Sequence, residues 1–138
     1  KLATDEKLRV PIIHHPAYSR GFVSPGVSGV ADYLQLGLLP RIFGADMPIF
    51  VSYGGRFTFT EKQCKRISSY IKRPMGLMKA ACPAPGGGVT DARLNELVEL
   101  YGNDTMFLVG GDMFRRGPDI EANMSYFVER LTKLSERT

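Results

Sequence analysis

Apolar positions along this chain fall into two patterns, short continuous runs and longer stretches with helical spacing. Four continuous runs predict buried strands, at residues 8–13, 47–51, 76–81 and 105–109. Apolar residues that recur every three or four positions predict helices, at residues 30–39, 61–71, 91–101 and 120–134. In the last of these helices, Met124, Phe127, Val128 and Leu131 share one face. The chain is therefore predicted to alternate four strands with four helices.

Polar and special residues mark the ends of these helices. Thr60 and Gln63 form a capping-box pattern, in which each side chain satisfies a free backbone N–H of the first turn. Thr90 is placed to cap the helix that follows it. Pro40 is expected to interrupt or kink the first helix, and Gly44 to end it.

Strict alternation of strand and helix predicts right-handed βαβ units around a parallel sheet. One compatible architecture is half of a (β/α)8 barrel, which in full needs roughly 250 residues, whereas this chain has 138. The alternative is a small open sheet with helices on both faces. With 43% hydrophobic residues the chain can bury a core, so we expect one globular domain.

Two glycine turns follow the third and fourth predicted strands. The first contains Gly86, Gly87 and Gly88, and the second contains Gly110 and Gly111. A glycine turn between a strand and a helix exposes backbone N–H groups to an anion, but either turn alone is better explained by a simple tight bend. Two turns at matching ends of consecutive units favour one shared phosphate site, as in barrels whose last two loops bind phosphate.

Other candidate groups lie in the earlier loops. His14 and His15 end the first predicted strand, where they either point into a site or cap the surface. Arg56 follows the second strand and either clamps a phosphate by a bidentate contact or lies exposed on a turn. The Gly-, Pro- and Ser-rich stretch 20–29 is long for a simple connection, and long loops in compact domains are often functional.

Composition narrows the function classes. The net charge of +4 is spread among acids and bases, which suits a phosphorylated substrate but gives little support for a nucleic-acid partner. Cys64 and Cys82 lack the spacing of metal ligands, so we expect reduced thiols. The sequence has no membrane-spanning run and no signal peptide. These features predict a cytoplasmic protein without membrane contact, and the absence of an initiator Met suggests a piece of a longer chain.

Five motifs in order resemble one known family. They are the stretches 13–17, 44–46, 53–57, 83–88 and 109–111. Together they resemble the C-terminal part of the barrel domain in RuBisCO-like proteins, which are form IV of the RuBisCO large-subunit family. The resemblance extends from about residue 8 to residue 131. It implies that residues 1–138 are strands five to eight of the barrel with their helices, and that the N-terminal domain and strands one to four are absent from this chain.

The resemblance also assigns roles to individual residues. His15 matches the active-site histidine at the end of strand five and is the expected catalytic residue. Gly87 and Gly88 match the strand-seven glycines whose backbone binds a substrate phosphate. Gly110 and Gly111 match the strand-eight pair that shares this phosphate.

Departures from RuBisCO itself point away from carboxylation. RuBisCO carries a serine where Gly86 stands, an arginine where Pro16 stands, and a Gly-Lys-Leu motif in the loop after strand six. The stretch 53–57 contains no lysine. Because that lysine serves the carboxylation step, the resemblance implies an enolase or isomerase of phosphorylated sugars or thio-sugars. A non-catalytic fragment that binds a phosphorylated ligand and a true ribulose-bisphosphate carboxylase remain the alternatives.

The resemblance further implies a cofactor and partners that this chain does not contain. Family members hold Mg2+ on a carbamylated lysine, an aspartate and a glutamate at the end of strand two, so no metal ligand is expected here. Mg2+ stabilises the negative charge of an enediolate. Half a barrel exposes two strand edges, which favour pairing. We therefore expect the missing N-terminal half as a partner, or a homodimer or higher oligomer.

Overall fold

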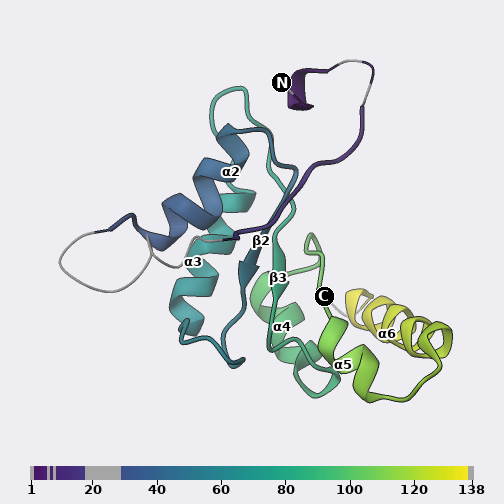
Figure 1. Cartoon of the computed structure of the whole chain (residues 1–138). Helices are drawn as coiled ribbons and strands as arrows, with labels where there is room; N and C mark the ends of the chain where they lie inside the picture. Colours follow the sequence, from purple (N-terminus) through teal and green to yellow (C-terminus); the bar gives the residue numbers. More distant parts are fainter. Residues whose placement is uncertain (1, 6, 8, 18–28, 137–138) are drawn as a thin grey trace.

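The computed structural model describes residues 2–5, 7, 9–17 and 29–136, so residues 20–28 of the predicted long loop lie outside the described residues (Figure 1). Three parallel strands pair in the order β1 (Ile13–His14), β2 (Met47–Val51) and β3 (Ala84–Gly86). The predicted α/β fold with a parallel sheet is confirmed. Among the described residues, no helix combines the length and apolar character needed to cross a membrane.

The helices pack along the strands and against one another. Figure 1 shows α2 and α3 beside β2, α4 beside β3, and α5 and α6 beyond them. Neighbouring helices touch, because α3 contacts α4 and α4 contacts α6. The α-helices span α2 (Leu39–Ile42), α3 (Glu61–Lys72), α4 (Leu94–Tyr101), α5 (Gly110–Arg115) and α6 (Ile120–Ser135). Three further helical segments are η1 (Leu2–Thr4), η2 (Tyr33–Leu38) and η3 (Asp91–Arg93).

The third strand lies later than predicted. Residues 76–81 do not form it, because Met75 and Met78 pair across a tight antiparallel turn and Leu77 is fully exposed. The strand is β3, whose residues Ala84 and Pro85 are buried. Proline is rare inside a strand, so the pattern of apolar residues misplaced this element.

The first strand is shorter than predicted. Of the described residues 9–13 in this run, only Ile13 belongs to β1. Ile12 instead forms hydrogen bonds with Asp46, the residue before β2. Its N–H donates to Asp46 Oδ2 at 2.8 Å, and its carbonyl accepts from the Asp46 N–H at 3.0 Å. Pro11 lacks the N–H that a longer ladder needs.

The fourth strand is reduced to one bridge. Within residues 105–109, Leu108 pairs with Gly86 in parallel. The N–H groups of Met106 and Leu108 donate to Pro83 and Pro85 at 2.9 and 3.1 Å, so this segment still follows β3 along its edge. The strands therefore lie side by side in the sheet in the same order as they occur in the sequence.

Helix boundaries follow the capping signals closely. The Thr60 Oγ1 accepts from the Gln63 N–H at 3.3 Å, and the Gln63 side chain accepts from the Thr60 N–H at 3.0 Å, so the capping box is confirmed. Thr90 lies at the cap position of η3 without a side-chain hydrogen bond. The helix does not end at Pro40, which occupies the first turn of α2 after the π-helical η2, and Gly44 follows the end of α2 with φ +92°.

The core lies between the strands and the helices that pack against them, with Phe50 of β2 in one cluster with residues of α3, α4 and α6. Its largest fully buried side chains include Phe50, Ile67, Leu97 and Phe127. The edge of the Tyr101 ring meets Phe50 with centroids 5.7 Å apart. These contacts fix α3, α4 and α6 around the strands and so fix the loops at the strand ends.

The apolar face predicted for the last helix is only partly correct. Phe127 is buried, but Met124 and Val128 are about half exposed. Asn123 and Leu134 are buried instead. Asn123 faces inward because its Nδ2 donates to the carbonyls of Met113 and Gly117, each at 3.0 Å, which tie the end of α5 to α6.

Candidate functional site

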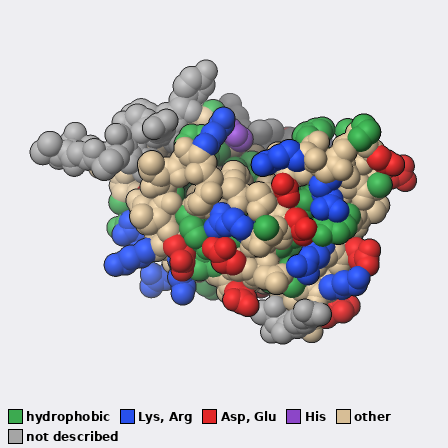
Figure 2. Space-filling view, turned by 90° about the horizontal axis from the view of Figure 1, so that it is seen from below, with side chains coloured by type: hydrophobic (Ala, Val, Ile, Leu, Met, Phe, Trp, Pro, Cys, Tyr) green, Lys and Arg blue, Asp and Glu red, His purple; other side chains and the backbone are tan. Residues whose placement is uncertain are grey.

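Three loops leave the sheet at the carboxyl ends of neighbouring strands. They follow β2 (residues 52–59), β3 (residues 87–90) and Leu108, whose strand runs into α5. Parallel strands place these loops at one edge of the sheet, where open α/β proteins hold their ligands. Figure 2 views the molecule from below and shows basic and acidic side chains interspersed on that face, without a large area of one charge.

The glycines of the first two loops pack backbone against backbone. A Cβ on Gly55 would lie 2.9 Å from the Gly88 nitrogen, and a Cβ on Gly88 would lie 2.7 Å from the Gly55 nitrogen. Gly87 and Gly88 have φ of +73° and +77°, in the left-handed region that favours glycine. The structure thus brings the predicted glycine turn into direct contact with the loop after β2.

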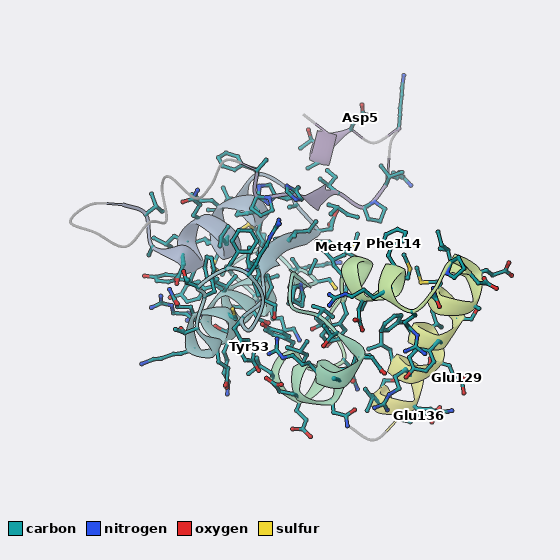
Figure 3. All side chains as sticks on the ribbon, turned by 60° about the horizontal axis from the view of Figure 1, so that its bottom comes forward. Asp5, Met47, Tyr53, Phe114, Glu129 and Glu136 are labelled. Carbon is teal, nitrogen blue, oxygen red and sulfur yellow. The ribbon has the colours of Figure 1, made fainter. Side chains whose placement is uncertain are left out.

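Arg93 fastens these two loops, and sequence reasoning did not identify it. Its Nη1 donates to the carbonyl oxygens of Tyr53 at 2.7 Å and Gly88 at 2.9 Å. Its Nη2 also pairs with Glu96 Oε1 at 3.0 Å. Figure 3 shows Tyr53 beside α4, the helix that carries Glu96. In the sequence, only the i,i+3 spacing of Arg93 and Glu96 could have predicted their ion pair.

Gly110 and Gly111 begin α5, a helix that the sequence pattern assigned to a loop. A Cβ on Gly110 would meet nothing within 4 Å, so the space beside it is open. The first N–H groups of a helix have no partner within it. This end of α5 is tied to η3 because Asp112 Oδ2 accepts from the Asp91 N–H at 2.8 Å.

Asp91 links the same region to α6. Its carboxylate accepts from the Tyr126 hydroxyl at 2.7 Å and lies 3.5 and 3.7 Å from the guanidinium nitrogens of Arg130 and Arg116. The Arg116 guanidinium stacks on the Tyr126 ring at 3.5 Å. These contacts hold the glycine pair of α5 in a fixed place relative to the β3 loop.

The remaining predicted residues lie at the same edge. Arg56 is exposed, with its guanidinium 4.9 Å from the Phe57 ring. His15 is exposed after β1, and its carbonyl accepts from the Ala17 N–H at 2.9 Å. His14 is half-buried, and burial, followed by the neighbouring His15, lowers its imidazole pKa. Among the described residues, no hydrogen bond or ion pair joins the side chain of His15 or Arg56 to the glycine turns, although Arg56 directly follows Gly55, which packs against Gly88.

The described residues do not fit a metal site. Within the described parts of the chain, no group of three or more His, Cys, Asp or Glu side chains is placed to hold a metal ion. The Mg2+ implied by the family resemblance therefore has no ligand set here, and the chemistry of these loops is that of backbone N–H donors and arginine.

The two cysteines are free thiols, and neither is a candidate for the chemistry of these loops. Cys64 is buried behind β2, and burial raises its thiol pKa to about 11. Cys82 is half-buried, and its pKa is also raised by burial. Both side chains are therefore protonated at neutral pH, which makes neither a nucleophile.

Several known proteins are similar to this chain in sequence, although no protein-family model matches it. The RuBisCO-like protein 1 of Rhodopseudomonas palustris is 34% identical over 116 residues, which are 84% of this chain and 30% of that protein. The 5-methylthioribulose-1-phosphate isomerase of Rhodospirillum rubrum is 31% identical over 81% of this chain and 30% of its own length. The 2,3-diketo-5-methylthiopentyl-1-phosphate enolase of Exiguobacterium sibiricum is 32% identical over 80% of this chain and 28% of its own length.

Solved structures give the same result. A RuBisCO-like protein from Alicyclobacillus acidocaldarius superposes with a TM-score of 0.83 at 28% identity, over 99% of this chain and 34% of that one. The RuBisCO-like protein from Rhodopseudomonas palustris gives a TM-score of 0.73 at 32% identity, over 89% of this chain and 31% of that one. The chain thus spans about 30% of the length of the proteins it matches.

Proposed function

Since this chain belongs to the RuBisCO-like protein family, we propose that it is the phosphate-binding part of an enolase or isomerase that acts on a phosphorylated sugar or thio-sugar. The chain covers about 30% of its relatives, so the activity is proposed for the complete protein. We further propose that its parallel units are strands five to eight of a (β/α)8 barrel, closed by strands one to four from outside this chain.

One observation carries the proposal: the loops after β2 and β3 meet through Gly55 and Gly88, with no room for a side chain on either. Such loops present bare backbone, and successive backbone N–H groups form a concavity suited to a phosphate. The glycine start of α5 follows at the end of the next strand, where barrel enzymes bind phosphate. This arrangement supports a phosphate grip shared by Gly87, Gly88, Gly110 and Gly111.

The relatives of this chain indicate the class of substrate. One relative isomerises 5-methylthioribulose 1-phosphate and another enolises 2,3-diketo-5-methylthiopentyl 1-phosphate. Both compounds carry a phosphate on a terminal carbon near a carbonyl group. We propose that the chain binds this phosphate, which leaves the carbonyl region free for proton transfer elsewhere in the site.

His15 is the proposed proton-transfer residue of this chain. It lies at the carboxyl end of β1, on the same edge as the glycine loops. An imidazole there can accept or donate a proton beside the carbonyl, or orient a substrate hydroxyl. When bound by residues outside this chain, Mg2+ would stabilise the enediolate charge.

The test is turnover by the complete protein. Each of the two phosphorylated thio-sugars is supplied in turn, and product formation and exchange of substrate protons with D2O are followed by NMR. We expect isomerisation or enolisation of one compound, and loss of activity when a chelator removes the metal. No exchange or turnover with either compound, in folded protein supplied with Mg2+, would contradict the proposed chemistry.

A second candidate is a non-catalytic module that binds a phosphorylated ligand. Both candidates expect no metal-binding cluster in the described residues, so they differ in what the complete protein does with the bound ligand. The non-catalytic module predicts phosphate affinity without proton exchange, so the same NMR experiment separates the two. Incorporation of labelled CO2 into ribulose bisphosphate would instead indicate a carboxylase.

A further inference from the structure

Arg93 bridges three segments of the chain that are otherwise separate. Its guanidinium contacts the loop after β2 through the Tyr53 carbonyl, the loop after β3 through the Gly88 carbonyl, and α4 through the Glu96 carboxylate. The side chain is only 20% exposed. Hydrogen bonds from a charged donor are stronger than neutral ones. One side chain therefore sets the relative position of both loops.

The loop after β2 is shaped to receive this guanidinium. A Cβ on Gly54 would lie 2.4 Å from Arg93 Nη1 and 2.7 Å from Cζ, so a side chain there would displace the arginine. The guanidinium also stacks on the Tyr53 ring at 4.5 Å. The Tyr53 hydroxyl donates to Glu96, which in turn accepts from Arg93 Nε at 3.3 Å. Tyr53 is thus held by its carbonyl, its ring and its hydroxyl.

A hydrogen bond that fixes a peptide carbonyl also fixes the direction of the N–H in the same peptide group. In a trans peptide the C=O and the following N–H point in opposite directions. With the Tyr53 and Gly88 carbonyls turned to Arg93, the N–H groups of Gly54 and Val89 point away from it. No hydrogen bond within the described residues uses either N–H. Arg93 therefore fixes the orientation of both peptides, and of their two N–H groups that of Gly54 belongs to an exposed residue whereas Val89 is buried.

We propose that Arg93 is a positioning residue, which joins the loops after β2 and β3 into one preformed site for a substrate phosphate. The inference rests on the proposed function of these loops and adds a residue that does not itself touch the ligand. Without the guanidinium, the Tyr53 and Gly88 peptides can rotate, and phosphate binding must then order them at a cost in affinity.

The experiment measures the dissociation constant of inorganic phosphate, and KM and kcat for the turned-over substrate, in the full-length protein. Arg93→Ala is expected to weaken phosphate binding about tenfold and to raise KM more than it lowers kcat. Arg93→Lys, which keeps a charge but lacks the two-pronged geometry, should recover part of the affinity. Arg73→Ala removes an exposed arginine after α3 and is the matched control, with unchanged constants.

Gly54→Ala supplies an independent route to the same effect. It should weaken phosphate binding at least as much as Arg93→Ala does, because its methyl group occupies the place of the guanidinium and because alanine at φ +75° strains the loop. In the double variant the two losses should add less than fully, since both remove the contact between Arg93 and this loop. Hydrogen exchange at residues 53–55 and 87–89 should be faster in each folded variant. If Arg93→Ala does not fold, Arg93→Lys and Gly54→Ala decide the question.

The outcomes distinguish this inference from the proposed function. Wild-type protein that binds neither phosphate nor a phosphorylated substrate overturns the proposed function, and the inference with it. Wild-type protein that binds phosphate, with unchanged affinity and unchanged loop exchange in folded Arg93 and Gly54 variants, overturns the inference alone.

Discussion

At the residue scale, the glycines of the candidate site differ in what surrounds them. Gly88 cannot accept a side chain, because the Gly55 backbone occupies the place of a Cβ. Gly110 can, because a Cβ there would meet nothing within 4 Å. Substitution at Gly110 therefore tests ligand binding without disturbing the fold, whereas substitution at Gly88 tests both together.

We predict that Gly110→Val raises KM for the phosphorylated substrate strongly, because the added side chain enters the space proposed for the phosphate. The unfolding temperature should change little, since no described atom lies in that space. Steady-state kinetics and a thermal unfolding curve provide the check. A KM equal to that of the wild type would remove Gly110 from the phosphate site.

Replacement of His15 with Ala is predicted to lower kcat by an order of magnitude or more, since general acid–base groups contribute about 100-fold or more. His14→Gln is the matched control, because it alters the adjacent imidazole within β1. Turnover that survives the His15 change would exclude this histidine from proton transfer. Equal losses in both variants would indicate a structural role for the end of β1.

Sequence reasoning at this scale proposed the glycines and a histidine as site residues but did not single out Arg93. The glycine turns are visible because their composition is unusual. Arg93 acts through the Tyr53 carbonyl, 40 residues away in the chain, and main-chain acceptors leave no trace in a sequence. Only its spacing to Glu96 was visible, and that spacing is common on helix surfaces.

At the element scale, helices were predicted better than strands. The capping box at Thr60 marked the start of α3 correctly, because local hydrogen bonds determine it. The strand β3 was placed too early, because the buried Pro85 within it does not resemble a strand residue. The helix α5 was missed, since Gly110 and Gly111 at its start indicate a loop.

The buried thiol between β2 and α3 predicts how stability depends on pH. The Cys64 pKa is raised to about 11 by burial, so the folded state retains its proton where the unfolded chain loses it. The unfolded state then binds fewer protons, and the free energy of unfolding should fall as pH rises above about 9. Tyr101 shifts in the same direction, also through burial.

Urea unfolding at pH 7, 9 and 10, in the wild type and in Cys64→Ala, measures this effect. The decline between pH 9 and pH 10 should be smaller in the variant, because one of the shifted groups is gone. An identical decline in both proteins would show that Cys64 does not contribute. In the native wild type, alkylation at pH 8 should modify Cys82 before Cys64.

At the scale of the whole molecule, the sequence predicted the parallel α/β fold because strict alternation of strand and helix allows few other topologies. The closed barrel depends on residues outside this chain and remains a proposal. Several apolar side chains lie exposed on the described surface, including Ile13 in β1, Phe43 after α2 and Phe114 in α5. Exposed apolar groups of this kind favour association with another chain or segment.

We therefore predict that this chain is not found as a stable monomer. Native mass spectrometry of the purified protein should show it joined to the remainder of its barrel, or to a second copy. Denaturation of the same sample then identifies the companion by mass. A stable species with the mass of one chain, and folded by circular dichroism, would contradict this expectation.

The central claim is that four glycines of two successive loops grip one phosphate. It is tested most directly by NMR titration of the full-length, 15N-glycine-labelled protein with inorganic phosphate. The amide signals of Gly87, Gly88, Gly110 and Gly111 should shift together with a single dissociation constant, while Gly102, at the far end of α4, should not move. Signals of the four glycines that stay in place at saturating phosphate, or that titrate with different constants, would contradict the claim.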